Sequence, residues 1–598
     1  MILLLRSLKI FFLDGELNRV IVNLFLLALF ALLDVFGLIL IAFLIINFGN
    51  LGEALLELLS SQRLLDLTNI SENKLFIFFC IFTIFYSIFN LISTVYVIRK
   101  ISIFSQLIGA KVKSTVLNHF LSKKWPSHSE SSFSENISRI INDGDEVAQM
   151  INFLLILFSR AFLALIIVFS LLFFDFYLTL YFVSVLLIAY FTIFYGFKSR
   201  IEKNGIIVSN SMDANMQVIK NLFGSIKEII FYDRQKVVLE NFNQNTFSLA
   251  NARGANIAFA SIPRFLIDSI IILALVAGII YFNFYSNLSN SEFITTLSVF
   301  GIACLKLLPA FQNIFYFVNE IYARVPNLSN INTLLESETK IRKKEDILIT
   351  NFVFKEEIRF KNVSFRYPNR ERFSIKDINL TLKKGQKIAL IGQSGSGKST
   401  VIDLLLRFND PDEGSLLIDQ KKVSDIEINE YRKNFSYIPQ KIYLFEGSLS
   451  ENISFNQKIE NSNLDKLHSV LSAVELIDFV ERLPKGLDTY ISDDIPSVSG
   501  GQKQRIGIAR SLFRGGEILI LDEGTNSLDP VLERKIFNSI EKLKNYTIIC
   551  ITHHISSLEN FDRIYLLNDG KIDDSGTFEE LRKTNKVFVE MLKNEKND

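Results

Sequence analysis

The sequence predicts a chain of two unlike halves: an α-helical domain of six membrane spans with long cytoplasmic helical extensions, and an α/β domain that follows it. Three observations predict this fold class. Long apolar runs fill the chain up to about residue 325, and they are too long for ordinary soluble helices. From about residue 353 to the end, β-branched runs alternate with Gly, Asp and Pro turns, a pattern typical of α/β domains. A polar, charged segment, 336–352, lies between the halves as a linker.

The overall composition excludes several classes of protein. Hydrophobic residues make up 49% of the 598 residues and charged residues only 21%, which excludes an intrinsically disordered chain. The 64 basic and 63 acidic side chains leave a net charge of +1, so no global basic field indicates a nucleic-acid partner. The three cysteines are too few for a disulfide scaffold, and we expect them to be buried small hydrophobes.

The apolar half, residues 1–335, contains six candidate spans. Each has the roughly 20 residues that a helix needs to cross a hydrocarbon core of about 30 Å. They lie at about 20–48, 75–97, 150–174, 178–197, 257–281 and 292–317. The N-terminal segment is basic and no small-residue cleavage site follows it, so we expect a short interfacial helix there rather than a signal peptide.

The charges of the loops predict the orientation of these spans. Segment 198–256 contains eight Lys and Arg residues, segment 98–149 is also basic, and segment 282–290 contains none. By the positive-inside rule, both basic segments and both termini are cytoplasmic. Because 75–121 contains no Pro and a single Gly, we expect one continuous helix of about 70 Å that extends beyond the membrane as a rod. The amphipathic stretch 52–67 suits the outer membrane surface.

The second half contains a phosphate-binding loop. The apolar run 387–391 leads into Gly-Gln-Ser-Gly-Ser-Gly-Lys-Ser-Thr at 392–400, and a helix-forming stretch follows. This is the G-x-x-x-x-G-K-[ST] pattern in its required strand–loop–helix context. The loop N–H groups are expected to wrap the phosphates of ATP while the lysine reaches the β- and γ-phosphates. The nucleotide-binding residues of the loop are Gly392, Ser394, Gly395, Gly397, Lys398, Ser399 and Thr400.

A second apolar run ends in two carboxylates. Residues 518–523 read Ile-Leu-Ile-Leu-Asp-Glu, as in a buried strand with acids at its end. Asp522 is suited to hold Mg²⁺ through its water shell, and Glu523 to polarise an attacking water. The pattern is weak alone, but downstream of a phosphate-binding loop it predicts an α/β P-loop ATPase domain with ATP and Mg²⁺ as cofactors.

Between these motifs, Val-Ser-Gly-Gly-Gln at 498–502 precedes a helix-forming run and predicts a second anion-binding helix N-terminus. With this motif included, residues 357–598 resemble, in order and end to end, the nucleotide-binding domain of ABC transporters. The resemblance implies an ATP hydrolase coupled to transport. It also implies that Ser499, Gly500, Gly501 and Gln502 contact the γ-phosphate of ATP held by a partner subunit.

The same resemblance implies roles for single residues. Tyr367 matches the aromatic residue that stacks on adenine, and Gln440 matches the glutamine that senses Mg²⁺. Asp529 belongs to the matching D-loop. A lone histidine is usually structural, but His553, which directly follows the strand-like run 547–552, matches the switch histidine at the γ-phosphate. The implied catalytic residues are therefore Glu523 and His553, and the implied Mg²⁺ ligands are Ser399, Gln440 and Asp522.

The sequence departs from the family pattern at three places. Val498 stands where Leu is usual, and Asp493 stands where Glu is usual. Gly524, Asn526 and Ser527 replace the commoner Ala, Ser and Ala. We expect the first change to be tolerated, and communication through the D-loop and coupling through segment 492–496 to differ in detail.

The family's ATP sites form across a dimer interface, so the resemblance implies a homodimer, with a heterodimer as the alternative. The span order and the long rods resemble a half-transporter of the type IV exporter fold. We therefore expect an integral protein of the bacterial plasma (inner) membrane, with the N-terminus and the ATPase domain in the cytoplasm. The expected partners are a second copy of the chain and membrane lipid, with no nucleic acid.

Ionisable residues inside the spans are candidates for substrate binding, because charges are costly in a membrane. Arg264 and Asp268 are four residues apart, so a local ion pair is the alternative for these two. Three cations that face one cavity would suit a pyrophosphate head group. The candidates are Asp34, Arg160, Arg264, Asp268 and Lys306.

Local patterns in the membrane half resemble one branch of the fold, the bacterial lipid-linked oligosaccharide flippases. They lie at 34–37, 52–67, 224–228, 263–268 and 306–309. The resemblance implies a flippase that moves a polyprenyl-diphosphate-linked oligosaccharide from the inner to the outer leaflet. A multidrug, lipid or peptide exporter is the alternative, and an ATP-gated channel or regulator is a third hypothesis.

Overall fold

The protein is described by a computed structural model that covers residues 16–46, 72–122, 125, 133–285, 290–339, 352–367, 372–455, 463–492, 498–524, 530–543, 546–552 and 554–597. The chain divides into two compact units. We call residues 1–123 with 130–342 the helical unit, and residues 124–129 with 343–598 the C-terminal unit. The expected interfacial helix before residue 16, the outward stretch 52–67 and most of the linker 336–352 lie outside the described residues.

Long helices form the helical unit. Four of them contain 49 to 51 residues, which corresponds to about 75 Å at 1.5 Å per residue. The rods that the sequence predicts are therefore continuous with the apolar segments. The helices are α2 (Glu16–Ile46), α4 (Glu72–Ser122), α6 (Phe133–Ser138), the π-helix η2 (Arg139–Asp143), α7 (Gly144–Phe174), α8 (Phe176–Gly224), α9 (Ile226–Phe231), α10 (Gln235–Tyr285) and α11 (Asn290–Thr339).

Five stretches among the described residues are long and apolar enough to cross a membrane. They are Glu16–Leu44, Asn73–Ser122, Glu135–Phe174, Phe176–Gly224 and Ser298–Leu335. These stretches coincide with the predicted spans 1, 2, 3, 4 and 6. The predicted span 257–281 lies within the single helix α10, so the count of six and the orientation stay predictions.

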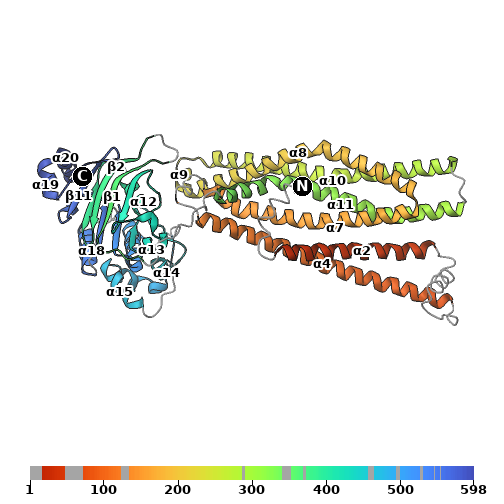
Figure 1. Ribbon diagram of the computed structural model, residues 1–598, viewed down its shortest axis with the longest axis horizontal. Helices are drawn as coiled ribbons and strands as arrows, with labels where there is room; N and C mark the ends of the chain where they lie inside the picture. The colour runs from red at the N-terminus through yellow and green to blue at the C-terminus, as the bar shows by residue number, and fades with distance from the viewer. Residues whose placement is uncertain are drawn as a thin grey trace. The chain divides into compact units, whose positions relative to one another are not determined.

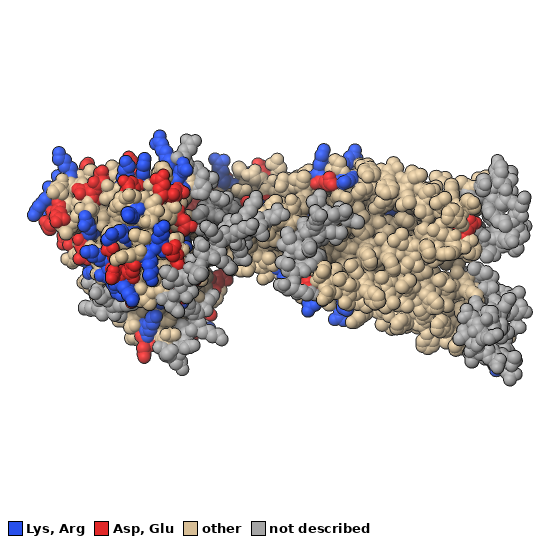
Figure 2. Space-filling view, in the orientation of Figure 1, with Lys and Arg blue, Asp and Glu red and all other residues tan. Residues whose placement is uncertain are grey.

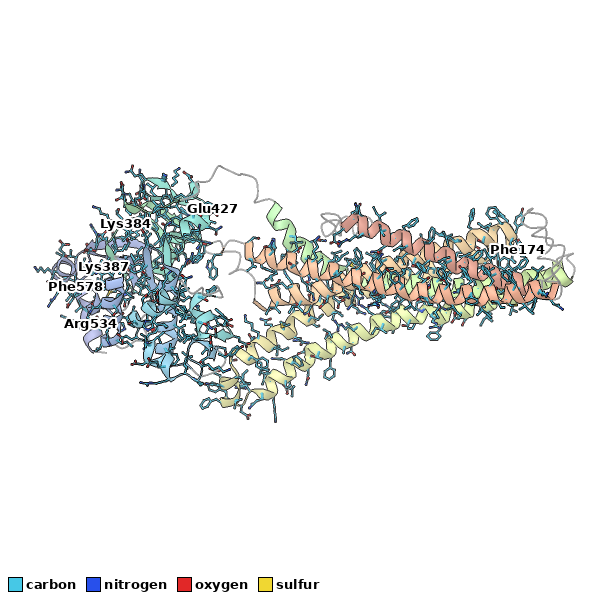
Figure 3. The ribbon with its side chains drawn as sticks, turned by 90° about the horizontal axis from the view of Figure 1, so that it is seen from below. Phe174, Lys384, Lys387, Glu427, Arg534 and Phe578 are labelled. Atoms are coloured by element: carbon cyan, nitrogen blue, oxygen red, sulfur yellow. The ribbon has the colours of Figure 1, made fainter. Side chains whose placement is uncertain are left out.

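Local chemistry ends the long helices α7 and α8. Asp175 separates α7 from α8, and its carboxylate accepts a hydrogen bond from the N–H of Leu178 at 3.0 Å, as an N-cap residue does. Phe174, the last residue of α7, is labelled in Figure 3. At the other end of α8, Ser225 and the short helix α9 form the turn that leads into α10.

The helices pack pairwise inside the helical unit. Helix α10 runs along α8, α11 packs on α7 and α8, and both α2 and α4 contact α7 (Figure 1). Close approach of α8 to α11 requires a glycine, since a Cβ atom on Gly205 would lie 2.5 Å from the carbonyl oxygen of Ala323. Figure 2 shows that much of the visible surface of this unit carries no Lys, Arg, Asp or Glu.

The C-terminal unit contains two main sheets. A four-stranded antiparallel sheet has the order β2-β1-β4-β5, and a six-stranded sheet has the order β12-β11-β3-β10-β9-β6. Its five strands from β11 to β6 are parallel, and β12 pairs antiparallel at the edge. The strands are β1 (Glu357–Phe365), β2 (Ile375–Lys383), β3 (Lys387–Ile391), β4 (Glu413–Ile418), β5 (Lys421–Lys422), β6 (Phe435–Ile438), β7 (Gly447–Ser448), β8 (Tyr490–Ile491), β9 (Ile518–Asp522), β10 (Thr547–Ile551), β11 (Arg563–Asn568) and β12 (Lys571–Gly576).

On one side, the six-stranded sheet shares a buried cluster with α12 (Lys398–Leu405) and the four-stranded sheet, and helices cover its other side. Figure 1 shows several of these helices around the strands. The described helices of this unit are α12 (Lys398–Leu405), α13 (Ile428–Arg432), α14 (Leu449–Ser454), α15 (Leu464–Ala473), α16 (Ile477–Arg482), α17 (Gly500–Arg514), α18 (Pro530–Leu543), α19 (Phe578–Thr584) and α20 (Lys586–Asn597), with the 3-10 helices η3 (Val423–Asp425), η5 (Gly486–Asp488) and η6 (Ile555–Leu558).

The strand order places the predicted motifs together. Strand β10 lies between β3 and β9, and all three are parallel. The phosphate-binding loop follows β3, Asp522 ends β9, and residue 553 follows β10 by two positions. Because the carboxyl ends of parallel strands meet at one edge, the phosphate-binding loop and Asp522, which are far apart in sequence, converge there.

Candidate nucleotide site and intramembrane cavity

The phosphate-binding loop adopts a backbone that only glycine tolerates. Gly392 and Gly397 have φ angles of 150° and 100°. A Cβ atom would lie 2.2 Å from the carbonyl oxygen of Leu567 at Gly392, and 2.7 Å from Ile375 Cγ2 at Gly397. The loop ends at Gly397, the N-cap of α12, so the unpaired N–H groups of the first helical turn face the predicted phosphate position.

Lys398 is buried at the start of α12, with 6% of its surface exposed. Its ammonium donates to the carbonyl oxygens of Gly392 at 2.8 Å and Gln393 at 3.0 Å. Burial lowers the pKa of Lys398, while the charges of Glu523 and Asp522 oppose this shift. The side chain therefore curls back over its own loop, from which it can extend to a phosphate.

Asp522 lies at the end of β9 with 8% of its surface exposed. Burial first, and then the charges of Glu523 and Asp403, raise the pKa of Asp522 to about 6. The Tyr437 hydroxyl donates to the Asp522 carboxylate at 3.4 Å. A buried carboxylate whose charge is this poorly compensated suits a divalent cation. Ser399, the second predicted oxygen ligand, is exposed and follows Lys398 on α12.

Glu523 has a backbone conformation that is rare for a residue with a side chain. Its φ angle is 52°, and a non-glycine residue in this region carries strain of order 1 kcal/mol or more. The Glu523 N–H is held by the carbonyl oxygen of Ile551 at 3.0 Å. Its carboxylate accepts a hydrogen bond from the Gln440 side-chain amide at 2.6 Å. The predicted catalytic carboxylate and the predicted Mg²⁺-sensing glutamine are thus in direct contact.

The departure at Gly524 has a steric reason. A Cβ atom at this position would lie 2.4 Å from Cγ2 of Ile438, a buried residue of β6. The alanine that is common in the family would therefore require Ile438 to move in this chain.

Tyr367 lies beside α12 at the edge of the phosphate-binding loop. Its hydroxyl donates to the Asp403 carboxylate at 3.2 Å and lies 3.5 Å from the Thr400 hydroxyl. Its ring packs edge-on against Phe365, with the ring centroids 5.0 Å apart. Burial raises the pKa of Asp403, and the Tyr367 hydrogen bond opposes that shift.

The signature residues form the start of α17. Ser499 is the N-cap: its hydroxyl accepts from the Gln502 N–H at 3.3 Å, and the Gln502 side chain accepts from the Ser499 N–H at 2.8 Å. This capping box leaves Gly500 and Gly501 without side chains at the helix N-terminus. Among the described residues, no hydrogen bond or ion pair joins 498–502 to the phosphate-binding loop.

Several predicted residues lie outside the described part of the chain. These are His553, the D-loop segment 526–529 with Asp529, and Asp493. Of the remaining predicted residues, the structure brings Lys398, Gln440, Asp522 and Glu523 to one edge of the sheet.

The ionisable residues of the membrane spans have different surroundings. Asp34 on α2 accepts a hydrogen bond from Asn90 at 2.9 Å, and the Lys306 ammonium lies 3.5 Å from the same carboxylate oxygen. Asp34 and Arg160 both line a cavity of about 280 Å³ between α2, α4, α7 and α11. Among the described residues, Arg160 has no ion-pair or hydrogen-bond partner.

The alternative for Arg264 and Asp268, a local ion pair between them, is not formed. The Asp268 carboxylate instead accepts a hydrogen bond from Gln312 on α11 at 2.7 Å, while Arg264 is exposed on α10. Arg264 does not line the cavity of Arg160. The single chain therefore does not bring all three predicted cations to one cavity.

Sequence reasoning missed three residues of these sites. Tyr437 contacts Asp522, Asp403 contacts Tyr367, and Asn90 contacts Asp34. Tyr437 lies three residues before Gln440, and Asp403 lies one helical turn after Thr400, so both could be found by extending known motifs. Asn90 could be found by searching the apolar runs for amides as well as for charges.

Comparisons with known proteins agree with this geometry. Residues 375–526 match the ABC transporter family. The chain is 30% identical over 485 residues to an ATP-dependent lipid A-core flippase of Sodalis glossinidius, covering 80% of this chain and 82% of that protein. It is 33% identical over 423 residues to the ATP-dependent permease MDL1 of Candida albicans, but this match spans only 58% of the permease, against 67% of this chain.

A solved structure has the same fold. The structure of a bacterial Atm1-family ABC exporter with ATP bound matches 97% of this chain and 99% of its own length with a TM-score of 0.78. The sequence identity is 20%, so this likeness concerns the fold alone.

Proposed function

Because the chain belongs to the ABC transporter family, as a type IV half-transporter whose ATPase domain couples ATP hydrolysis to transport, we propose that it is a flippase for lipids with an anionic head group. The finer proposal is a lipid-linked oligosaccharide carried on a polyprenyl diphosphate, moved from the inner to the outer leaflet. The cavity that contains the unpartnered Arg160 is the observation that carries this proposal.

The chemistry of the cavity favours an anion. A guanidinium without a carboxylate partner is costly inside a membrane unless a ligand or water compensates it. Its planar donors match the oxygens of a phosphate or pyrophosphate. Lys306 already lies beside Asp34, so Arg160 carries the uncompensated charge. Apolar lining residues of the same cavity, such as Leu27, Phe30 and Ile101, suit the first part of a lipid chain.

The relatives favour a second candidate substrate. Several are named ATP-dependent lipid A-core flippases, and a lipid of that type also carries anionic groups on an apolar anchor. The same cavity chemistry therefore serves both candidates, which differ in the head group and the number of acyl or prenyl chains.

The nucleotide site supplies the energy in this proposal. Lys398, the loop N–H groups and Ser399 bind the phosphates of ATP, with Tyr367 beside the base. Asp522, Ser399 and Gln440 are the side chains that would hold Mg²⁺, which would supply neutralisation of the phosphate charge. Glu523 polarises the attacking water and His553 contacts the γ-phosphate.

A second copy of the chain completes each site. Ser499 and the two glycines at the start of α17 approach the γ-phosphate held by the partner subunit. The proposed assembly is a homodimer in the bacterial inner membrane, with both C-terminal units in the cytoplasm.

Reconstitution in vesicles tests the substrate. Purified protein is placed in proteoliposomes that contain either a polyprenyl-diphosphate-linked oligosaccharide or a lipid A-core glycolipid, and ATP-dependent exposure of each head group is measured. We expect translocation of the diphosphate-linked glycan, with no translocation in a Glu523→Gln variant. Exclusive translocation of the lipid A-core glycolipid would replace the finer proposal with the second candidate, and translocation of neutral drugs alone would contradict both.

A further inference from the structure

The C-terminal helix α20 packs against the segment that follows the predicted switch histidine. Phe588 is fully buried, and Met591 and Leu592 pack with Ile555 and Leu558 of η6 in one hydrophobic cluster. Phe578 of α19, labelled in Figure 3, lies edge-on to Phe588 with the ring centroids 5.4 Å apart. The N-terminus of α20 is anchored as well, since the Asn585 side chain accepts from the Phe588 N–H at 3.0 Å.

The buried face of α20 ends in a carboxylate. Residues 588, 591, 592 and 595 recur at helical spacing and so share one face, but the last of them is Glu595. Its carboxylate accepts hydrogen bonds from the Ser556 N–H at 3.0 Å and from the Ser556 hydroxyl at 2.8 Å. The side chain of Glu595 is 18% exposed, and its carboxylate lies 3.8 Å from Nδ1 of His554.

Glu595 performs the task of a capping residue for η6. The N-cap of η6 is His554, whose side chain makes no capping hydrogen bond. A helix start without a cap leaves N–H groups unpaired. The Glu595 carboxylate pairs with the N–H of Ser556, so a side chain about 40 residues away replaces the missing local cap.

His554, the N-cap of η6, is itself hydrogen-bonded to the residue that follows β10. The His554 N–H donates to the Thr552 hydroxyl at 3.0 Å, and Thr552 is a buried residue directly after β10. In the sequence, residue 553 follows Thr552 and directly precedes His554, the N-cap of a 3-10 helix whose start is held by Glu595.

We propose that Glu595 is a positioning residue for ATP hydrolysis, which acts by holding η6 so that His553 can reach the γ-phosphate. The proposal rests on the role proposed above for His553. Packing of α20 against η6 is thereby required for fast hydrolysis. The contact between Glu595 and η6 involves no residue of the phosphate-binding loop.

The test compares variants of the full-length protein in lipid nanodiscs. Glu595→Ala is expected to lower kcat for ATP hydrolysis about tenfold, the factor for one lost charge-assisted hydrogen-bond pair, and to leave KM for ATP unchanged. Glu590→Ala is the matched control, because Glu590 is exposed on the same helix and should leave both constants unchanged. Glu595→Gln keeps one acceptor oxygen and should fall between the two, which keeps the test open if Glu595→Ala folds poorly.

Two further measurements separate positioning from general packing. Hydrogen exchange of the amides at 554–558 should accelerate in Glu595→Ala, while the amides of β9 stay protected. In a His553→Ala background, Glu595→Ala should lower kcat no further, since both changes act on one contact. A full tenfold loss in that background, a rise in KM with kcat unchanged, or an unchanged kcat in Glu595→Ala would overturn the proposal. Full activity of His553→Ala alone would instead refute the role proposed for His553.

Discussion

The two units treat charge in opposite ways. At the nucleotide site, burial lowers the pKa of Lys398 against the charges of Glu523 and Asp522, and burial together with the charge of Glu523 raises the pKa of Asp522. In the helical unit, Asp34 is balanced by Lys306 and Asn90, Asp268 is held by Gln312, and Arg160 stands apart. The difference teaches that the nucleotide site keeps buried charges of both signs in place before its cofactor binds, whereas the cavity of the helical unit presents one arginine, Arg160, that has no partner among the described residues.

Glu523→Gln is the change with the largest expected effect, and it tests whether the nucleotide site depends on a single carboxylate. We expect kcat for ATP hydrolysis to fall about 10²–10³-fold, because a general base contributes that much, with ATP binding retained. ATPase assays and equilibrium binding of a fluorescent ATP analogue measure the two quantities. Glu559→Gln, an exposed carboxylate of the same unit, is the control. Loss of binding in Glu523→Gln would mean that the carboxylate organises the site rather than the water.

Asp522→Asn tests whether the buried negative charge of Asp522 destabilises the folded protein when Mg²⁺ and nucleotide are absent. The pKa of Asp522 is raised to about 6 in the folded protein, against about 3.9 in an unfolded chain. The folded state therefore binds a proton more tightly, and ionisation of Asp522 destabilises it above pH 6. Without Mg²⁺ and nucleotide, Asp522→Asn should raise the free energy of unfolding at pH 7.5 by at most about 3 kcal/mol.

The pH dependence of this increase in the free energy of unfolding tests whether ionisation of Asp522 is its cause. It should shrink as the pH falls from above 6 to below 4, because the wild-type carboxyl is then protonated in both states. Denaturant unfolding of the chelator-treated protein measures it. Asp573→Asn, at an exposed position, is the control for loss of a carboxylate in the same unit. A gain in Asp522→Asn that is constant from pH 4 to 7.5 would contradict the assigned cause.

Arg160→Gln tests whether the arginine without a partner in the cavity of the helical unit takes part in substrate binding. We expect substrate-stimulated ATPase activity in proteoliposomes to fall about tenfold, the effect of one lost charge-assisted contact, while basal ATPase activity stays within twofold. Arg264→Gln is the matched control, because Arg264 is exposed and does not line the cavity. Equal losses in both variants would show that the cavity does not distinguish these arginines, and the contrast between the units would weaken.

Tyr367→Phe has the smallest expected effect and examines how finely the nucleotide site is positioned. The variant keeps the aromatic ring but loses the hydrogen bond to Asp403. We expect KM for ATP to rise about two- to threefold with kcat unchanged. Tyr367→Ala should raise KM about tenfold through lost stacking. If both variants match wild type, Tyr367 does not contact the base.

Much of the nucleotide site follows from local sequence. The loop at 392–400 needs glycines at positive φ and a helix start, and both requirements are readable from residue types and spacing. Gln440 and Glu523 are named by their motifs, but their mutual hydrogen bond is not. It depends on β6 lying beside β9, a non-local pairing that periodicity does not report.

The membrane half was predicted less completely for a physical reason. Long apolar helices are indicated by composition alone, but the partner of a charge depends on which helix faces share a layer. Arg264 and Asp268 satisfy the i, i+4 rule, yet Asp268 contacts α11 instead. The pairing of Lys306 with Asp34 joins residues 272 positions apart in sequence, beyond the reach of any local pattern.

By itself, the sequence determined that this protein has an apolar helical half and a P-loop ATPase half, because hydrophobic periodicity and phosphate-loop chemistry are local properties of the chain. The tertiary structure alone decided that Asp522 is paired with Tyr437, that Arg160 is left without a partner among the described residues, and that Glu595 caps η6. Each of these features depends on elements that only folding brings together. Their energetic effects depend on burial and on the distances between charges, which a local sequence pattern does not encode.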